Sequence, residues 1–327
     1  MKFKKITIII LASLLLFNLK ANDTIGYQNR ADVIEFINMM QKKHGLNKDL
    51  LTDLFSGVTF QEKVIRIMNR QPEGTMTWSR YKAMMVTEER INSGRVFIDN
   101  YNQDLKRAED IYGVPAKIIA SIIGIETKYG KITGNIRVLD ALSTLSFDYP
   151  RRAEFFKIQL EEFLLLTEEE DLDASKIKGS VAGAMGYGQF MPDSYRNYAV
   201  DFDFDGKRDI LNNPVDAIGS VANFLNKKGK WEPNTEVALK ANLKGDRPKL
   251  KSTFKPYITV SELNTLGLRP VDNLQSQLRV IPLELEMQEG YEYWLGLKNY
   301  QAISRYNRSK LYIMAVFEFS ESLAEFL

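Results

Sequence analysis

The sequence predicts an α+β fold that is mainly α, with a small antiparallel β insertion toward the C-terminus. Two observations support this. Apolar residues recur at helical spacing over most of residues 22–228, in runs bounded by glycine or proline. Between about residues 230 and 289 this spacing fades, and Leu283, Leu285 and Met287 alternate as in a half-buried strand. At 327 residues, the chain is long enough for roughly two domains.

The first helices are predicted from apolar runs that end at glycines. These runs cover residues 33–40, 50–55, 97–111 and 116–129. The glycines that end them are Gly45, Gly57, Gly113 and Gly130. Pro115 can open the fourth helix, because the first turn needs no N–H at that position. The fourth run is apolar almost all round, so we expect that helix to be buried.

The later elements are marked by proline and serine. Pro150 is predicted to open a helix that reaches the acidic residues 168–171, and Pro214 another that ends at Gly229. Pro282 suggests an edge strand, because proline cannot donate to a sheet ladder. Ser309 can cap a last amphipathic helix.

Residues 1–21 are predicted to be a cleaved signal peptide rather than part of the fold. Three lysines precede an apolar stretch over residues 6–17, and a small residue, Ala21, follows. The apolar stretch is too short to span a bilayer comfortably. Without the four lysines of this segment, 40 basic and 42 acidic residues remain. This balance does not indicate a basic nucleic-acid binder.

Composition excludes several kinds of chemistry. The chain has no cysteine, which rules out disulfides, zinc–thiolate sites, thiol nucleophiles and a lipid-anchor cysteine. The only histidine is His44, which is predicted to lie on the surface near a helix end. No exposed heptad seam indicates a coiled-coil oligomer, so a monomer is expected.

Glu126 is the candidate general acid. It follows the apolar run 118–125, at the end of a helix predicted to be buried. Apolar neighbours and the unfavourable end of the helix dipole should both raise its pKa, as a general acid requires. The alternative from spacing alone is an exposed glutamate paired with Lys128 or Lys131.

Residues 178–195 form a glycine-rich block that includes Tyr187 and Gln189. Glycines allow a ligand or another backbone to approach closely. Aromatic rings mixed with amides and hydroxyls suit sugars, which present C–H faces and hydroxyl edges. The block is not a phosphate loop, because no Gly-Lys-Ser/Thr follows it. A tight helix-packing segment is the alternative.

Residues 201–209 resemble the opening of an EF-hand loop. Carboxylates stand at loop positions one, three, five and nine, glycine at six, and a backbone carbonyl is available at seven. These residues are Asp201, Asp203, Asp205, Gly206, Lys207 and Asp209. Position twelve is Asn212 rather than the usual glutamate. The alternative to a structural Ca²⁺ site is a solvated acidic turn.

Five motifs together resemble the B-type lytic murein transglycosylases. They cover residues 122–130, 140–153, 183–192, 214–223 and 305–309 and so span most of the chain after the signal. The resemblance implies a lysozyme-like helical core with an additional helical domain over residues 22–228. It also implies a β-rich insertion over 229–289 and a return to the core over 290–327. The implied activity is cleavage of the β-1,4 bond between N-acetylmuramic acid and N-acetylglucosamine without water, leaving a 1,6-anhydro end.

The resemblance also assigns roles to individual residues. It makes Glu126 the single catalytic carboxyl, acting as acid and then as base. It places further residues in substrate binding, namely Ser180, Gln189, Arg151, Arg152, Tyr306 and Asn307. The two arginines would meet the acidic peptide stem of murein. It completes the calcium loop, residues 201–216, with Asp216. No organic cofactor or nucleic-acid partner is implied.

Two departures from the family pattern qualify these expectations. Phe224 stands where a tyrosine is expected, which puts one subsite contact in doubt. The lipid-anchor cysteine of some members is missing, so we expect a soluble periplasmic protein.

Two other functions remain open. One is a hydrolytic muramidase, for which no motif supplies the second carboxylate. The other is a non-catalytic murein-binding or scaffold protein.

Overall fold

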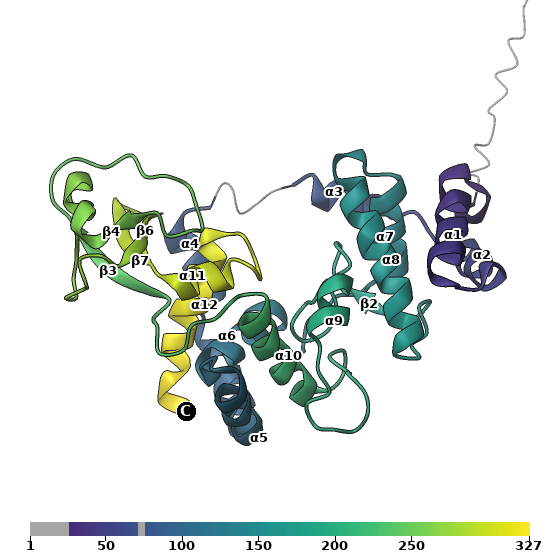
Figure 1. Cartoon of the computed structure of the whole chain (residues 1–327), viewed down its shortest axis with the longest axis horizontal. Coiled ribbons are helices and arrows are strands. Elements are labelled where there is room, and N and C mark those ends of the chain that lie inside the picture. The colour runs from purple at the N-terminus through teal and green to yellow at the C-terminus, as the bar shows by residue number, and fades with distance from the viewer. Residues whose placement is uncertain (1–25, 71–75) are drawn as a thin grey trace, which may run out of the picture. The chain divides into compact units, whose positions relative to one another are not determined.

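The computed structural model describes residues 26–70 and 76–327, so the predicted signal segment 1–21 lies outside it. The chain divides into two compact units, the first ending at Ser56 and the second beginning at Gly57. In the first unit, η1 (Tyr27–Asn29) precedes α1 (Ala31–His44) and α2 (Lys48–Ser56) (Figure 1). The predicted stop at Gly45 is confirmed, because its left-handed backbone (φ 73°) lets its N–H bond the carbonyl of Gln41.

The second unit is built mainly from helices. They are α3 (Glu62–Met68), α4 (Trp78–Met85), α5 (Glu88–Tyr112), α6 (Ala116–Thr127), α7 (Val138–Phe147), α8 (Ala153–Glu169), α9 (Pro192–Tyr198), α10 (Pro214–Lys227), α11 (Lys298–Ile303) and α12 (Lys310–Leu323). Short 3₁₀ turns are η3 (Pro150–Arg152), η4 (Val260–Leu266) and η5 (Ala324–Phe326). Pro214 opens α10, and Ser309 caps α12 by accepting the N–H of Tyr312, both as predicted.

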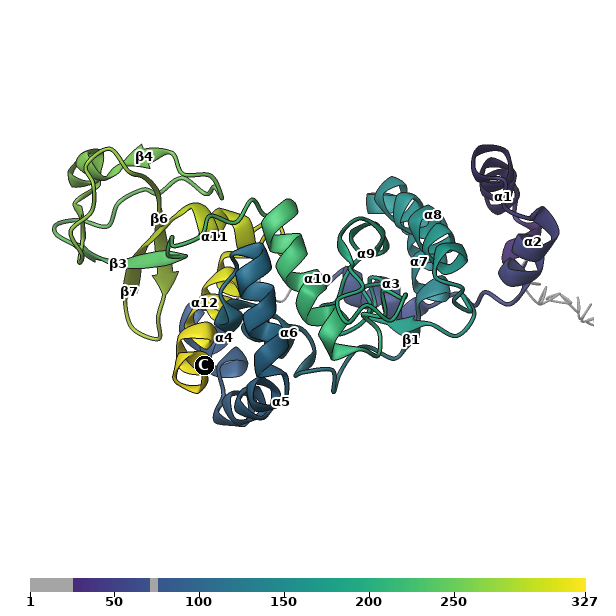
Figure 2. The ribbon, with the colours of Figure 1, turned by 60° about the horizontal axis from the view of Figure 1, so that its bottom comes forward.

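Helix α6 is the centre of this unit. It packs against α5, α10 and α12, and these neighbours surround it in Figure 2. Ten of its twelve residues are buried, which confirms the expectation from its apolar sequence. Because three helices cover it, the residue that ends α6 is held in a fixed position. Glu126 is the second-last residue of this helix.

The prediction that this helix runs to Tyr129, with Gly130 as its stop, is wrong. The helix ends at Thr127, and the next three residues, Lys128, Tyr129 and Gly130, all have left-handed φ values, of 50°, 60° and 84°. Glycine is required at the last of these positions, since an added Cβ would lie 2.3 Å from the ring of Tyr187. The contact with the glycine-rich block, which the local sequence does not show, thus sets the path of the chain after Glu126.

Two sheets complete the second unit. β1 (Ile136–Arg137) pairs antiparallel with β2 (Lys178–Gly179), so the start of the glycine-rich block is joined to the segment after α6. The larger sheet has the order β4-β6-β7-β3-β5 and is antiparallel throughout. Its strands are β3 (Ala238–Leu243), β4 (Ile258–Thr259), β5 (Leu268–Pro270), β6 (Arg279–Glu286) and β7 (Tyr291–Gly296). The mainly helical fold with a small antiparallel sheet is as predicted.

The β insertion extends further than its predicted end at residue 289, because β7 lies beyond that point and pairs with both β6 and β3. The prediction that Pro282 marks an edge strand is wrong, because β6 lies between β4 and β7 in the sheet. However, β4 pairs with only Arg279 and Val280, so from Pro282 onward β6 has no strand partner on this side among the described residues.

Candidate active site

The carboxylate of Glu126 lies half-buried at the C-terminal end of α6. The phenol of Tyr312, on α12, donates a 2.6 Å hydrogen bond to its Oε1 atom. Packing of α12 on α6 brings the two residues together across 186 positions of sequence. The glutamate that the sequence singled out is therefore held by a tyrosine that sequence reasoning passed over as part of an apolar helix.

Two phenols lie near the charge of Glu126, that of the buried Tyr312 and that of the half-buried Tyr306. Burial raises the pKa of Tyr312 well above its usual value, and the negative charge of Glu126 raises it further. Burial and the same charge also raise the pKa of Tyr306. Both hydroxyls therefore stay protonated at neutral pH and can serve as hydrogen-bond donors.

Tyr306 joins the C-terminal segment to the glycine-rich block. Its hydroxyl donates to the carbonyl oxygen of Gly188. Its ring meets the ring of Phe224 edge-on at 4.8 Å between centroids, and that of Phe190 at 5.9 Å. Phe224, the departure from the family pattern, is thus a buried ring that supports Tyr306. The neighbouring Asn307 is half-buried.

Thr127 connects the end of α6 to the same block. Its Oγ1 lies 2.9 Å from the carbonyl oxygen of Tyr187 and 3.2 Å from that of Ile123, either of which it can donate to. The same Oγ1 accepts the N–H of Gly130 at 2.9 Å. The backbone next to Glu126 is therefore tied to the block by a buried hydroxyl. In the sequence, the only indication that Thr127 belongs to the site is that it follows the candidate acid directly.

Ser180 and Gln189 shape the backbone of the block. The Oγ of Ser180 accepts N–H groups from Ala182 and Ala184 at 3.3 and 3.1 Å. The Nε2 group of Gln189 donates to the carbonyl oxygens of Thr133 and Gly186, at 2.9 and 3.1 Å. These bonds hold the turn in place. They leave the hydroxyl hydrogen of Ser180 and the Oε1 atom of Gln189 as the groups that can face a ligand.

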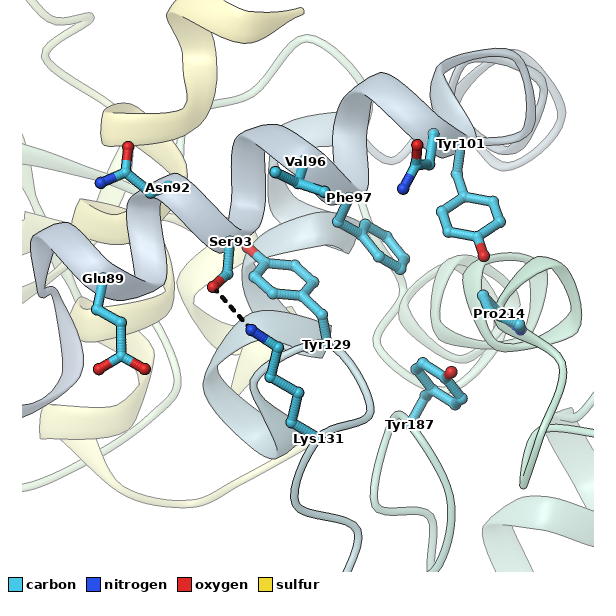
Figure 3. A pocket seen from close by; sticks show the side chains of 11 residues that line it. Glu89, Asn92, Ser93, Val96, Phe97, Tyr101, Tyr129, Lys131, Tyr187 and Pro214 are labelled. Carbon is cyan, nitrogen blue, oxygen red and sulfur yellow. Dashed lines mark hydrogen bonds between the residues drawn. The ribbon is translucent and has the colours of Figure 1, made fainter.

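The remaining predicted binding residues are spread over other surfaces. Arg151 and Arg152 are exposed in η3, ahead of α8, and the guanidinium of Arg152 lies 4.3 Å from the ring centroid of Phe155. The side chain of Tyr187 lines a cavity beside α5 (Figure 3). Glu126 is not among the residues that line this cavity.

A cluster of three carboxylates in the acidic loop can hold a cation. Oxygen atoms of Asp201, Asp203 and Asp216 lie within 4.8 Å of one another. Asp216 is fully buried in the first turn of α10, although its oxygens accept the N–H groups of Phe202 and Asp209, both at 2.7 Å. Burial raises its pKa, and the charge of Asp203 raises it further. A hard cation would offset this repulsion and the cost of burial, so the donor set fits such an ion.

The other predicted ligands are not part of this cluster. The carboxylate of Asp209 accepts the N–H groups of Leu211 and Asn212, both at 3.0 Å. That of Asp205 accepts the N–H of Lys207 at 2.9 Å. These two carboxylates therefore act as local turn caps in the structure.

In the described ranges, no helix combines the length and the apolar character needed to cross a membrane. Comparison with known families matches residues 28–321 to the transglycosylase SLT domain. Membrane-bound lytic murein transglycosylase B of Escherichia coli K12 is 42% identical over 307 residues, which cover 91% of this chain and 84% of that protein.

Solved structures are similar over the same extent. The lytic transglycosylase SltB1 of Pseudomonas aeruginosa superposes with a TM-score of 0.87 at 41% identity, over 91% of this chain and 99% of that chain. The Escherichia coli lytic transglycosylase Slt35, solved in complex with calcium, superposes with a TM-score of 0.84 at 43% identity, over 91% of this chain and 94% of that chain.

Proposed function

The chain belongs to the SLT-domain transglycosylase family and is a lytic transglycosylase that acts on peptidoglycan, and from this premise we propose that Glu126 carries its chemistry. The observation that supports Glu126 is its position. It lies half-buried at the end of a helix packed on three sides, with the phenol of Tyr312 bonded to its carboxylate. A single carboxyl held in this way suits a reaction in which one group gives a proton and later takes one back.

In the first step, Glu126 protonates the glycosidic oxygen between N-acetylmuramic acid and N-acetylglucosamine, and the bond from C1 to that oxygen breaks. The acetamido oxygen of the muramic residue shields the positive charge on C1, as in the substrate-assisted glycosidases. We propose that Ser180 and Asn307 orient this group. The hydroxyl of Tyr312 stabilises the carboxylate that forms on Glu126 once the proton has left.

In the second step, the carboxylate of Glu126 takes the proton of the C6 hydroxyl, whose oxygen attacks C1 of the same sugar. The product is a 1,6-anhydromuramic end, and Glu126 returns to its protonated form without consuming water. Proximity of C6 to C1 replaces the second carboxylate of an ordinary glycosidase. Arg151 and Arg152, being exposed cations, suit contact with the acidic stem peptide.

The cluster of Asp201, Asp203 and Asp216 is proposed to bind Ca²⁺ in a structural role. Such an ion supplies positive charge to a buried carboxylate and so stabilises the loop ahead of α10. The proposed place of action is the periplasm, which the predicted export signal and the murein substrate both favour. There the protein is expected to act as a soluble monomer.

The test is a digest of purified murein, read by mass spectrometry, with the wild type and with Glu126→Gln. We expect anhydromuropeptides from the wild type and a loss of rate of at least about 10²–10⁴-fold in the variant. Glu168→Gln, at an exposed glutamate of α8 in the same unit, is the matched control and should retain activity.

Each other outcome decides against part of the proposal. Equal anhydro products from wild type and Glu126→Gln would show that Glu126 is not the acid. Products one water heavier would make the enzyme a hydrolytic muramidase. Binding to murein with no release of sugar by the wild type would make it a scaffold protein.

A further inference from the structure

A cavity of about 550 Å³ lies on the α5 side of the segment that follows Glu126. Its volume is in the range, roughly 300–1,000 Å³, of cavities that bind small molecules. One wall is a stripe of α5 that includes Ser93 and Val96, and the other is formed by Lys131 and Tyr187 (Figure 3). The mechanism proposed above uses none of the α5 residues.

The walls of the cavity combine ring faces with polar groups. The rings belong to Phe97, Tyr101, Tyr129 and Tyr187. The polar groups belong to Asn92, Ser93, Asn100, Lys131 and Glu89. One anionic and one cationic side chain give this lining no net charge, so it does not suit a phosphate or an acidic peptide. Aromatic faces next to amides and a hydroxyl suit a neutral sugar, whose C–H face packs on a ring while its hydroxyl and acetamido groups bond the amides.

The backbone is shaped around this cavity. α5 departs from helical geometry at one residue, Tyr101 (φ −125°, ψ 25°), whose ring faces that of Tyr187 across the opening (Figure 3). The Nζ of Lys131 donates to Ser93 Oγ at 3.3 Å and so links the two walls. The ring of Tyr187 rests on Gly130, at which no side chain would fit.

We propose that this cavity is a second carbohydrate-binding site, which takes an N-acetylated hexose unit of a glycan strand. It lies apart from the catalytic carboxylate, since Glu126 bonds Tyr312 on α12 whereas the cavity is walled by α5. The two regions are connected through Tyr187. Its ring lines the cavity, and its carbonyl oxygen lies 2.9 Å from the Thr127 hydroxyl, one residue from Glu126. A sugar against this ring therefore braces the backbone that positions the acid.

The test is an NMR titration of the ¹⁵N-labelled protein with tri-N-acetylglucosamine, carried out in the wild type and in Glu126→Gln. The backbone amides of Ser93 and Asn100 report binding in the cavity. The backbone amide of Asn307 reports binding at the proposed catalytic site around Glu126. We expect the cavity reporters to shift in both proteins. Cellotriose, which lacks acetamido groups, should bind at this site at least about tenfold more weakly.

Two matched variants locate the binding. Val96 and Ile111 are exposed aliphatic residues of α5, with 54% and 58% of their surface accessible, and only Val96 lines the cavity. Val96→Trp should fill the cavity and weaken the response of the cavity reporters at least about tenfold. Ile111→Trp should leave it unchanged. Both variants should keep the response of Asn307.

Unchanged cavity reporters in the wild type would overturn the proposal, as would an equal response in Val96→Trp. Equal binding of cellotriose would overturn the assignment to an N-acetylated sugar. None of these readouts depends on cleavage of murein. A failure here is therefore distinguishable from a failure of Glu126 as the acid, which the murein digest reports.

Discussion

The hydroxyl of Tyr312 donates a 2.6 Å hydrogen bond to Oε1 of Glu126. The glutamate is the second-last residue of the central helix α6, and the tyrosine lies in the first turn of α12. The bond is directed at a carboxylate that, in the proposed reaction, changes its charge twice. It therefore favours the ionised form of Glu126, which is the form that must accept the proton of the C6 hydroxyl.

Tyr312→Phe should lower the rate of anhydromuropeptide formation by roughly 10–100-fold, because a hydrogen bond to a charged group is worth about 1.5–3 kcal/mol. The fold should be retained, since the ring keeps its packing. The matched control is Tyr300→Phe, whose buried hydroxyl has no hydrogen-bond partner in the structure. Initial rates and thermal melting of both variants check this. Equal rates for Tyr312→Phe and the wild type would remove Tyr312 from the mechanism.

Thr127→Val should reduce both stability and activity. The substitution keeps the shape of the side chain but removes the oxygen that accepts from Gly130 and bonds toward Tyr187. Leaving such buried groups unpaired costs about 1–3 kcal/mol. Thr167→Val is the control, because the Oγ1 of Thr167 bonds only the nearby carbonyl of Leu164, within its own helix. Denaturant unfolding and murein digestion should separate the two variants, and equal losses in both would contradict a role for Thr127.

Removal of calcium should lower the melting temperature. With a Kd of about 10⁻⁴–10⁻³ M, 10 mM Ca²⁺ would stabilise the folded protein by about 1.4–2.7 kcal/mol, which corresponds to a few degrees. EDTA should remove this gain and Ca²⁺ should restore it. Asp216→Asn should abolish the response, whereas Asp173→Asn, outside the loop, should keep it. A melting curve of the wild type that is indifferent to both EDTA and Ca²⁺ would show that the loop binds no calcium.

At alkaline pH the protein should unfold as its buried tyrosines ionise. Burial raises the pKa of five of the 15 tyrosines well above their ordinary value of about 10. They are Tyr129, Tyr195, Tyr300, Tyr306 and Tyr312. Because the folded pKa exceeds the unfolded one, the stability that these groups contribute is complete below pH 10 and is lost as the pH rises above it.

Absorbance at 295 nm against pH, with circular dichroism in parallel, checks this. About a third of the tyrosine signal should appear only together with the loss of helical signal. Titration of all tyrosines near pH 10 in a protein that is still folded would contradict the structure.

Several boundaries of the longer helices could be predicted because the chain marks them locally, whereas α3, α4, α7, α9 and α11 were not predicted. Gly45 and Gly113 adopt the left-handed geometry that ends α1 and α5. Ser309 caps the start of α12 with its own hydroxyl oxygen. The end of α6 could not be predicted in this way. Lys128 adopts the left-handed conformation there, although glycine would be the usual choice. The residues on either side of it, Thr127 and Gly130, both contact Tyr187 of the glycine-rich block, about 60 residues further along the chain, and so fix the path of the backbone through this lysine.

In the candidate site, too, some features could be predicted from the local sequence and others depend on tertiary contacts. Glu126 could be singled out from its place after an apolar run and from the family motif. Nothing local marks Tyr312 as the hydrogen-bond donor to Glu126, or shows that the hydroxyl of the adjacent Thr127 contacts the glycine-rich block, since both residues stand in sequences typical of a buried helix. Likewise, the spacing of the acidic loop suggested five ligands and the family resemblance a sixth, Asp216, but the structure brings three carboxylates together and turns that of Asp209 toward Asn212.

The sequence by itself determined most of the longer helices, the approximate place of the β insertion, the glutamate that is the candidate acid and the family that the motifs resemble. These properties follow from local spacing, capping and motif identity, which a chain carries whatever its fold. Only the tertiary structure decided what touches Glu126, which aspartates converge, and that Tyr187 lines a cavity beside α5. Those relationships join residues as much as 186 positions apart, and they arise when the buried α6 packs against α5, α10 and α12. Packing of this kind depends on the shape of every neighbour at once, so no single stretch of sequence records it.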